Sequence, residues 1–569
     1  MTCSAMTPAL CSWPLALRMW PLTLILALLP MWGVGLFARG LWTPDEPREA
    51  AIAGAMADGA GWAVPVLAGV PFCEKPPLTY WLAGASITAF GRNPAAARIP
   101  NLLWAALAVL AVGGLAAAAA GGGRPGAVAG LVAGLAMGTS ELTAQVLIWL
   151  ASDAPLTTGV CLTLFGAWRG LNATTTRSRL GWYLLMHAGL ALGFLAKNIV
   201  AWVFPGLAFM AFLVWEWRFR ELLRWELWIG FLLQAALISP WIWGVAQHPD
   251  ARHLLKVFFY DNLVGRFIPV EGVSYQDGHR NWPGKYLVEL PAFLLPWTFL
   301  AAAAVRRAWT GCLTAGPDRA AWRFAAAALL PATALLSIRN TARGIYLAPV
   351  LPGMMVAIGL WAARHGAQPD RFERVCLWGT GVLLLVVAIL GPLAGQGVSI
   401  WWQGVALKGQ LVVDALLWMG GIVLAILAVR QAQAGRWAVG GGFLGGAVAL
   451  ALVGGICTGL QVVDCWQNPA PMTRAVAEAA QRGPVAIYRP DETTLAALDW
   501  QARLRPVVLT TPAEVLAAVA TQPNLRILVK QPRSGPGGAG QSLLDLGLVE
   551  VQRLDIPGGR RHALFAGKP

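Results

Sequence analysis

The sequence predicts an all-α polytopic membrane protein of about 13 transmembrane helices, with a small α/β domain at its C-terminal end. Of the 569 residues, 57% are hydrophobic and only 12% are charged, and the mean hydropathy is +0.58. Soluble domains have about a quarter of their residues charged. The 29 Trp and 64 Gly residues are typical of helices packed in lipid. This composition excludes a soluble globular enzyme, a disordered chain and a disulfide scaffold.

The transmembrane helices are predicted from apolar runs, because a spanning helix needs roughly 20 mostly apolar residues. The first run is expected to remain as an anchor, since it is longer than the roughly 7–15 apolar residues of a signal peptide. The predicted spans are 20–38, 96–120, 126–143, 152–168, 181–196, 199–215, 226–246, 286–304, 321–337, 344–362, 375–394, 409–428 and 437–457.

The distribution of Lys and Arg predicts the orientation. With a cytoplasmic N-terminus, the short inner loops carry 17 basic residues, all Arg, whereas the short outer loops carry four. This asymmetry predicts an outer, periplasmic C-terminus and two long outer loops at about 39–95 and 247–285. Most of the net charge of +15 is then an orientation signal facing anionic membrane lipid, and no nucleic-acid partner is expected. The inner arginines are Arg18, Arg124, Arg169, Arg177, Arg179, Arg218, Arg220, Arg224, Arg306, Arg307, Arg319, Arg323, Arg364, Arg371, Arg374, Arg430 and Arg436.

The composition changes near residue 464, where helical and strand periods begin to alternate. Met472–Gln481 has the helical period, and Val485–Tyr488 and Leu525–Lys530 are short apolar runs typical of strands. The sequence therefore predicts a membrane domain over 1–463 and a periplasmic α/β domain over 464–569. The eight cysteines have no C-x-x-C spacing, so neither a zinc site nor a disulfide framework is expected from them.

Charged residues at a membrane boundary are costly unless they are used, so outer clusters are the first candidates for a functional site. In Thr43-Pro-Asp-Glu-Pro-Arg-Glu49, Thr43 and Glu46 fit a capping box at a helix start. Asp45 and Glu46 also fit a general base that meets an extracytoplasmic substrate. Capping and catalysis are compatible interpretations of this motif.

A second outer cluster contains Glu74 and Lys75, followed by Pro76-Pro77 and an apolar segment. Lys75 is open to two interpretations from sequence: its ammonium group reaches the lipid headgroups, or it binds a lipid phosphate as a point charge.

Three further regions supply polar residues on the same side. Asp153 follows Ser152 at the outer end of a predicted span, and starting a helix is one interpretation of this Ser-Asp pair. Arg343 and Tyr346 lie at an outer boundary, and the loop 247–285 contains Arg266 and His279. A lone His is more often structural than a ligand. Two or three acids and several cations at the same depth nevertheless favour an acid-assisted transfer beside a lipid-phosphate leaving group.

These motifs resemble those of the bacterial aminoarabinose transferase and protein O-mannosyltransferase family, over about residues 20–360. The block from Glu74 to Trp81 is the most specific part of the resemblance. The matching segments, in the family's order, are Asp45-Glu46, Gly69-Val-Pro-Phe-Cys-Glu-Lys-Pro-Pro-Leu-Thr-Tyr-Trp81, Ala95-Ala-Ala-Arg98-Ile-Pro100, Ser152-Asp153-Ala-Pro-Leu156, Asn262-Leu-Val-Gly-Arg-Phe267, Leu295-Pro-Trp297 and Tyr346-Leu-Ala-Pro-Val-Leu-Pro352.

The resemblance implies a GT-C membrane glycosyltransferase of the bacterial inner membrane that uses a polyprenyl-phosphate-linked sugar donor. It implies that Asp45, its neighbour Glu46 and Asp153 are the catalytic acids. It further implies that Lys75, Arg343, Tyr346 and Arg266 bind the donor phosphate, the last from a loop that the family folds over its cavity. No cofactor is certain, although family members can hold a divalent metal near the positions of Glu74 and His279. One departure is Ile345, since the family often has two tyrosines where this chain has Ile345-Tyr346.

The expected function is transfer of a sugar, hexosyl or pentosyl, to lipid A of lipopolysaccharide or to another envelope glycolipid. Protein O-mannosyltransferase-type transfer to Ser/Thr is the alternative within enzymes. A transporter or flippase of a polyprenyl-linked sugar is an alternative of another class. A flippase would show internal repeats and polar residues near the bilayer midplane, whereas the ionisable residues here gather at the outer rim.

Overall fold

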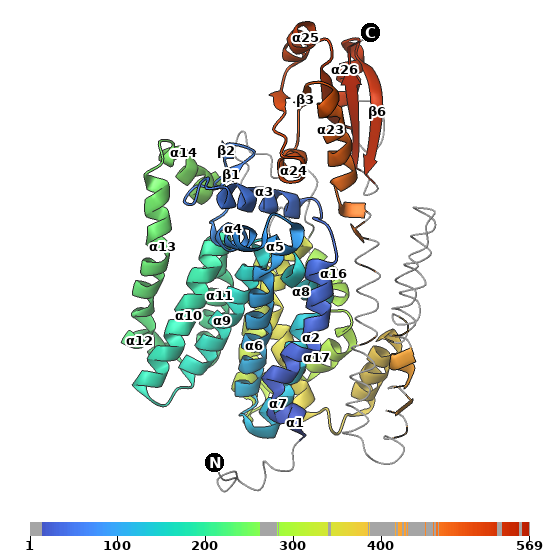
Figure 1. The fold of residues 1–569 in the computed structure, drawn as a ribbon. Coiled ribbons are helices and arrows are strands. Elements are labelled where there is room, and N and C mark those ends of the chain that lie inside the picture. Colours follow the sequence, from blue (N-terminus) through green and yellow to red (C-terminus); the bar gives the residue numbers. More distant parts are fainter. Residues whose placement is uncertain are drawn as a thin grey trace.

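The structure is a computed structural model in which long helices form a bundle beneath two outer layers (Figure 1). It describes residues 14–261, 282, 284–338, 343–384, 468–531, 538–556 and 560–567, together with isolated residues between 386 and 467. The main helices of the bundle are α2 (Trp20–Phe37), α6 (Pro100–Ala119), α7 (Gly123–Thr139), α9 (Asp153–Leu171), α10 (Thr176–Lys197), α11 (Val200–Trp215), α13 (Gly230–Ala246), α17 (Thr298–Leu313), α18 (Arg319–Ile338) and α19 (Pro352–Arg364).

A layer of shorter elements lies across one end of the bundle (Figure 1). Its helices run across the long helices instead of along them, and they come mostly from the predicted outer loop at about 39–95. The layer contains α3 (Asp45–Ala57), the hairpin of β1 (Val66–Leu67) and β2 (Val70–Pro71), α4 (Leu78–Phe90) and α5 (Pro94–Arg98).

The described helices support a polytopic membrane protein, with a smaller number of spans than the sequence predicts. Five helices are long and apolar enough to cross a membrane, and the number rises to eight if each sharply bent pair is one span. The predicted spans 409–428 and 437–457 fall largely outside the described residues, as does the second half of 375–394. The prediction of about 13 spans therefore stays a prediction.

The predicted span 286–304 is wrong as a continuous helix. Here α16 (Lys285–Phe293) and α17 meet at an angle of 120°. Pro296 lies in the break, and a proline both lacks the amide donor and disfavours the helical conformation of the residue before it. Smaller bends of 69° and 52° separate α7 from α8 (Glu141–Ile148) and η4 (Gly344–Val350) from α19.

Helices α9 and α10 cross closely, and their crossing places Asp153 at the same end of the bundle as Lys197. A Cβ atom added at Gly159 would lie 2.6 Å from the backbone oxygen of Gly189, and one added at Gly189 would lie 2.5 Å from the oxygen of Gly159. Small residues allow such backbone contact between membrane helices. The start of α9 and the end of α10 are held together by this contact.

We expect Gly159→Ala to lower the free energy of unfolding by about 1–3 kcal/mol, because the new methyl group meets backbone atoms that cannot rotate away. Thermal unfolding of the purified protein in detergent measures the change. Gly206→Ala is the matched control, since a Cβ atom there has nothing within 4 Å. Equal unfolding temperatures for the two variants would contradict the close crossing.

The C-terminal unit contains a five-stranded sheet in the order β4-β3-β5-β7-β6. Strands β4 and β5 are parallel to β3, whereas β7 is antiparallel to its neighbours β5 and β6. Its elements are α23 (Ala470–Arg482), β3 (Val485–Tyr488), α24 (Glu492–Ala497), η5 (Leu498–Ala502), β4 (Val507–Leu509), α25 (Pro512–Thr521), β5 (Arg526–Gln531), α26 (Ala539–Asp545), β6 (Val549–Ile556) and β7 (Arg560–Ala566).

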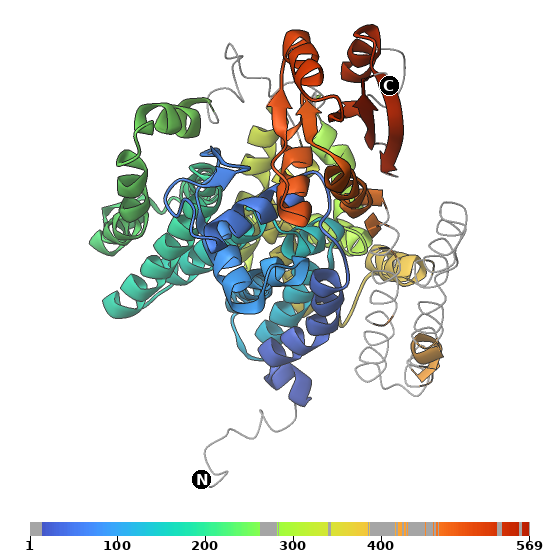
Figure 2. The same ribbon diagram turned by 45° about the horizontal axis from the view of Figure 1, so that its top comes forward.

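Alternation along the central strand explains how this sheet is covered on both faces. Ile527 and Val529 share one hydrophobic cluster with residues of α25 and α26, whereas Leu528 between them belongs to a second cluster with residues of α23 and α24. Successive strand residues point to opposite faces, so a short apolar run supplies two cores. Figures 1 and 2 show the unit stacked on the outer layer, with α24 facing α3.

Candidate active site

Asp45 begins α3, in the layer of short helices at one end of the bundle. Its place in the first helical turn suits a carboxylate, because the N-terminal end of a helix is positive. The predicted capping box is wrong: Pro44 precedes the first helical residue, and no side chain caps this helix. The hydroxyl of Thr43 instead donates to Oε1 of Gln467 at 2.8 Å.

The carboxylate of Asp45 lies between two guanidinium groups. Arg343 Nη2 donates to Oδ2 at 2.8 Å, and Arg48 Nη2 donates to Oδ1 at 3.2 Å. Burial opposes ionisation of this carboxyl, but the positive charges of Arg343, Lys75 and Arg48 outweigh it and hold the pKa of Asp45 well below its ordinary value. Asp45 is therefore ionised at neutral pH.

Glu46, although adjacent in sequence, occupies a different environment. Its two carboxylate oxygens accept hydrogen bonds from Arg39 and Arg98 at 2.5–2.9 Å. They also accept from the backbone N–H groups of Trp42 at 2.8 Å and Leu150 at 2.9 Å. Burial disfavours its charge, but Arg39 and Arg98 outweigh burial and lower the pKa of Glu46 to about 2. This side chain is fully buried, and its partners join three segments of the chain.

Lys75 reaches α3 from the segment that follows the β1–β2 hairpin. Its Nζ atom lies 2.5 Å from Oε1 of Glu49, and Arg48 Nη2 lies 3.8 Å from the same oxygen. Glu49 is fully buried. Burial and the negative charge of Glu49 raise the pKa of the neighbouring Tyr80 well above its ordinary value. Glu49 thus holds two of the cations around Asp45, a role that its place in the motif did not reveal.

Asp153 forms an ion pair with Lys197, at the point where α9 begins and α10 ends. The Nζ atom of Lys197 also lies 5.0 Å from the centre of the Tyr346 ring. Burial lowers the pKa of Arg343, but the negative charge and the hydrogen bond of Asp45 prevail and raise it above its ordinary value, with smaller contributions from Tyr346 and Asp153. Asp45, Asp153, Arg343 and Tyr346 therefore share one site, which also includes Lys197.

Two of the predicted site residues, Arg266 and His279, lie outside the described residues. Glu74 is described, but within the ranges that the structure describes no group of three or more His, Cys, Asp or Glu side chains could hold a metal ion. The described residues alone therefore do not fit a metal site, and the pair of Glu74 and His279 stays a prediction.

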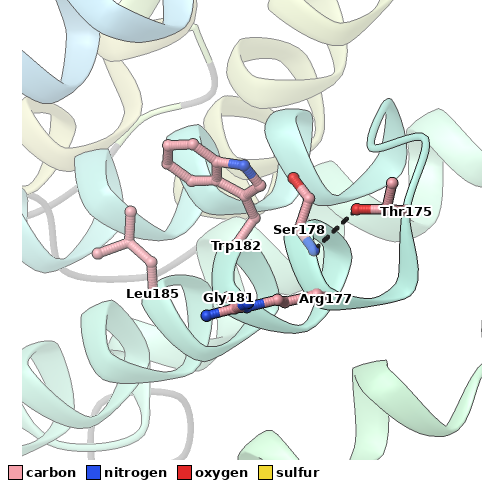
Figure 3. A pocket seen from close by; sticks show the side chains of 6 residues that line it. All are labelled: Thr175, Arg177, Ser178, Gly181, Trp182 and Leu185. Carbon is pink, nitrogen blue, oxygen red and sulfur yellow. Dashed lines mark hydrogen bonds between the residues drawn. The ribbon is translucent and has the colours of Figure 1, made fainter.

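A cavity of about 570 Å³ lies beside the first turns of α10 (Figure 3), whereas Lys197 of the candidate site ends this helix. It is lined by residues at the start of α10, among them Arg177, Trp182 and Leu185. Thr175 caps the helix there by accepting a hydrogen bond from the Ser178 N–H at 3.2 Å. Leu185 is the lining residue nearest to Lys197 along α10, and roughly 18 Å of helix separate the two. The cavity is not part of the candidate active site.

The comparisons with known proteins support the resemblance found in the motifs. The family model for dolichyl-phosphate-mannose-protein mannosyltransferase matches residues 74–243. The undecaprenyl phosphate-alpha-4-amino-4-deoxy-L-arabinose arabinosyl transferase of Pseudomonas aeruginosa strain LESB58 is 32% identical over 370 residues, 63% of this chain and 61% of the relative. The Edwardsiella ictaluri transferase of the same name is 28% identical, and the match covers 63% of each chain. The match thus covers less than two thirds of the length of these curated relatives.

The solved structures extend the likeness to the fold of nearly the whole chain. ArnT from Cupriavidus metallidurans bound to undecaprenyl phosphate superposes with a TM-score of 0.69 at 19% identity, covering 97% of this chain and 99% of that chain. The apo form of the same protein gives a TM-score of 0.66. The resemblance predicted from the motifs is therefore confirmed: the chain is similar in sequence to the aminoarabinose transferases over 63% of its length, and it shares the fold of ArnT.

Proposed function

We propose that the chain is an integral-membrane glycosyltransferase that moves a sugar from a polyprenyl-phosphate donor to an acceptor at the outer face of the bacterial inner membrane. The observation that carries the proposal is the ionised carboxylate of Asp45, which lies between Arg343 and Arg48 with Lys75 beside them. A phosphate leaving group needs cations, and an acceptor hydroxyl needs a base or an orienting group. This site offers both within one layer of short helices.

In the proposed mechanism, the donor phosphate binds the cations Lys75 and Arg343, with Tyr346 and, from the loop 247–285, Arg266. These groups neutralise the charge that develops on the phosphate as the sugar leaves. Asp45 accepts the proton of the acceptor hydroxyl or orients that hydroxyl, whose oxygen bonds to the sugar as the bond to the donor phosphate breaks. It mainly positions an acceptor that is already an ionised phosphate. Asp153, neutralised by Lys197, is the second acid near the sugar.

Glu46 has a different role in this proposal from the catalytic one expected from sequence. Its carboxylate oxygens are occupied by two arginines and two backbone N–H groups. A carboxylate that accepts so many hydrogen bonds has little remaining capacity for a substrate proton. Glu46 therefore positions the segment before Asp45.

The names of the relatives support 4-amino-4-deoxy-L-arabinose, a pentose, as the sugar and undecaprenyl phosphate as its carrier. Lipid A or another envelope glycolipid is the proposed acceptor. The description of the matching family model favours a second candidate, transfer of mannose to a protein.

One experiment distinguishes these acceptors and sugars. The purified protein is incubated with the undecaprenyl-phosphate aminoarabinose donor and either lipid A or a Ser/Thr-rich peptide, and the products are measured by mass spectrometry. A product of lipid A plus aminoarabinose supports the proposal. Transfer to the peptide alone, from a mannose donor, would replace it with the mannosyltransferase function. Mass spectrometry of envelope lipids with and without the gene tests the same point in cells.

We expect Lys75→Met to raise the KM for the lipid donor by about 10–100-fold, because a charge-assisted contact to phosphate contributes roughly 1.5–3 kcal/mol. The chain should stay folded, since Arg48 remains 3.8 Å from the buried Glu49. Arg505→Met is the control, because its cation is on the surface of the C-terminal unit and pairs with Asp499. An unchanged KM in Lys75→Met would remove Lys75 from the donor site.

A further inference from the structure

The C-terminal unit packs directly on the helix that carries Asp45. Ala496 and Trp500 of this unit share one hydrophobic cluster with Ala50 and Ile52 of α3. The hydroxyl of Thr493 donates to the backbone oxygen of Pro44 at 3.2 Å. Figure 1 shows α24 directly above α3. The unit therefore meets α3 beside the candidate catalytic acid.

One ion pair in this contact reaches the catalytic acid itself. Arg48 Nη1 donates to Oε2 of Glu492 at 2.8 Å, whereas its Nη2 donates to Oδ1 of Asp45 at 3.2 Å. The two nitrogens belong to one planar guanidinium group with a fixed fork geometry. The orientation of Glu492 therefore fixes the direction from which Arg48 approaches Asp45.

Arg48 and Asp45 are largely buried, whereas Glu492 is exposed, so Glu492 is the partner of Arg48 on the side away from the candidate site. Its side chain is 17% exposed and that of Asp45 is 9% exposed, whereas Glu492 is 49% exposed. A long Arg side chain has about 2 kcal/mol of rotamer entropy, so a partner on each side of its fork helps to keep it in one geometry. Glu492 holds the outer side of the fork.

A second ion pair between the same two parts does not reach the site. Arg503 directly follows η5, and its Nη1 atom lies 2.8 Å from Oδ2 of Asp58. Asp58 is the C-cap residue of α3, at the opposite end of this helix from Asp45. This pair joins the C-terminal unit to α3, and it contacts neither Asp45 nor Arg48. The chain thus offers a docking contact with no connection to the catalytic acid as a comparison.

We propose that Glu492 is a positioning residue for the transfer reaction, acting through Arg48 on the orientation of Asp45. The docked C-terminal unit then acts on the active site through this ion pair, without Glu492 itself touching the substrate. This inference rests on the proposed glycosyltransferase function.

The test compares Glu492→Gln with Arg503→Gln in full-length protein, using the undecaprenyl-phosphate aminoarabinose donor and lipid A. Misplacing a catalytic group by a small distance costs a large factor in rate. We expect Glu492→Gln to lower kcat roughly tenfold with the donor KM changed less than about twofold. Arg503→Gln should match the wild type in both constants. Glu492→Asp should recover part of the lost rate.

A double-mutant cycle separates positioning from docking. Arg48→Gln removes the connecting side chain, so adding Glu492→Gln to it should cause no further loss of kcat. Losses that multiply in the double variant, or equal losses in Glu492→Gln and Arg503→Gln, would overturn the role of Glu492 and leave the proposed function intact. A wild-type protein that transfers no sugar to lipid A or to peptide would overturn the proposed function, and with it the role of Glu492.

Discussion

Asp45→Asn is expected to lower kcat by about 10²–10⁴-fold, the range associated with loss of a general base. The substitution preserves the shape of the side chain but removes the negative charge that lies between Arg343 and Arg48. The amide cannot deprotonate an acceptor hydroxyl, and its NH₂ group cannot accept a hydrogen bond from either guanidinium. Transfer to lipid A by the purified variant, normalised to folded protein, measures the effect.

The fold should largely survive this substitution, because Arg343 and Arg48 are both partly exposed and Arg48 keeps Glu492 as a partner. Asp58→Asn makes the same chemical change at the other end of α3, where the side chain is 49% exposed. We expect it to keep the wild-type rate. Full activity in Asp45→Asn would remove Asp45 from the mechanism.

The parts of the site that follow from local sequence could be predicted. Apolar runs place Asp45 and Asp153 next to predicted bilayer boundaries, and the block around Lys75 is specific enough to suggest a phosphate site. The structure places Asp45 beside Arg343, which is 298 positions away in sequence. The motifs predicted that both belong to one site. They could not predict the ion pair, since it depends on how α3 lies across the bundle.

The parts that depend on contacts between distant segments could not be predicted. Lys197 differs from other outer cations only after α9 and α10 are packed and Asp153 is found beside it. Glu492 lies in a segment whose composition is that of an ordinary soluble domain, and nothing in its neighbourhood indicates Arg48 as its partner. Such contacts carry no periodic or compositional signal in a single sequence.

Adjacent residues with the same chemistry are a further limit of sequence reasoning. The sequence predicts one catalytic role for Asp45 and Glu46, because they are neighbouring acids in the motif. Successive helical residues point in directions about 100° apart. Asp45 therefore contacts Arg48 and Arg343, whereas Glu46 contacts the fully buried Arg98.

Glu46→Gln is expected to lower the free energy of unfolding by about 3–5 kcal/mol, because it leaves two buried guanidinium groups without their counter-charge. The side chains of Arg39 and Arg98 are 1% and 0% exposed, so water cannot replace the lost carboxylate. In the variant, the NH₂ group of the new glutamine would replace a carboxylate oxygen that accepts hydrogen bonds. Two donors, this NH₂ group and an arginine N–H, would then face each other. Thermal unfolding in detergent and the yield of monodisperse protein measure the loss.

Two comparisons distinguish this structural role from the catalytic one that the motif suggested. The double variant Glu46→Gln with Arg39→Gln restores the balance of charge in the buried cluster, and we expect it to be more stable than Glu46→Gln alone. Asp45→Asn, one residue away, should show the opposite pattern of lost transfer with retained fold. A Glu46→Gln variant that is as stable as the wild type but inactive would return Glu46 to the catalytic group, because only a role in the reaction could then explain its loss of function.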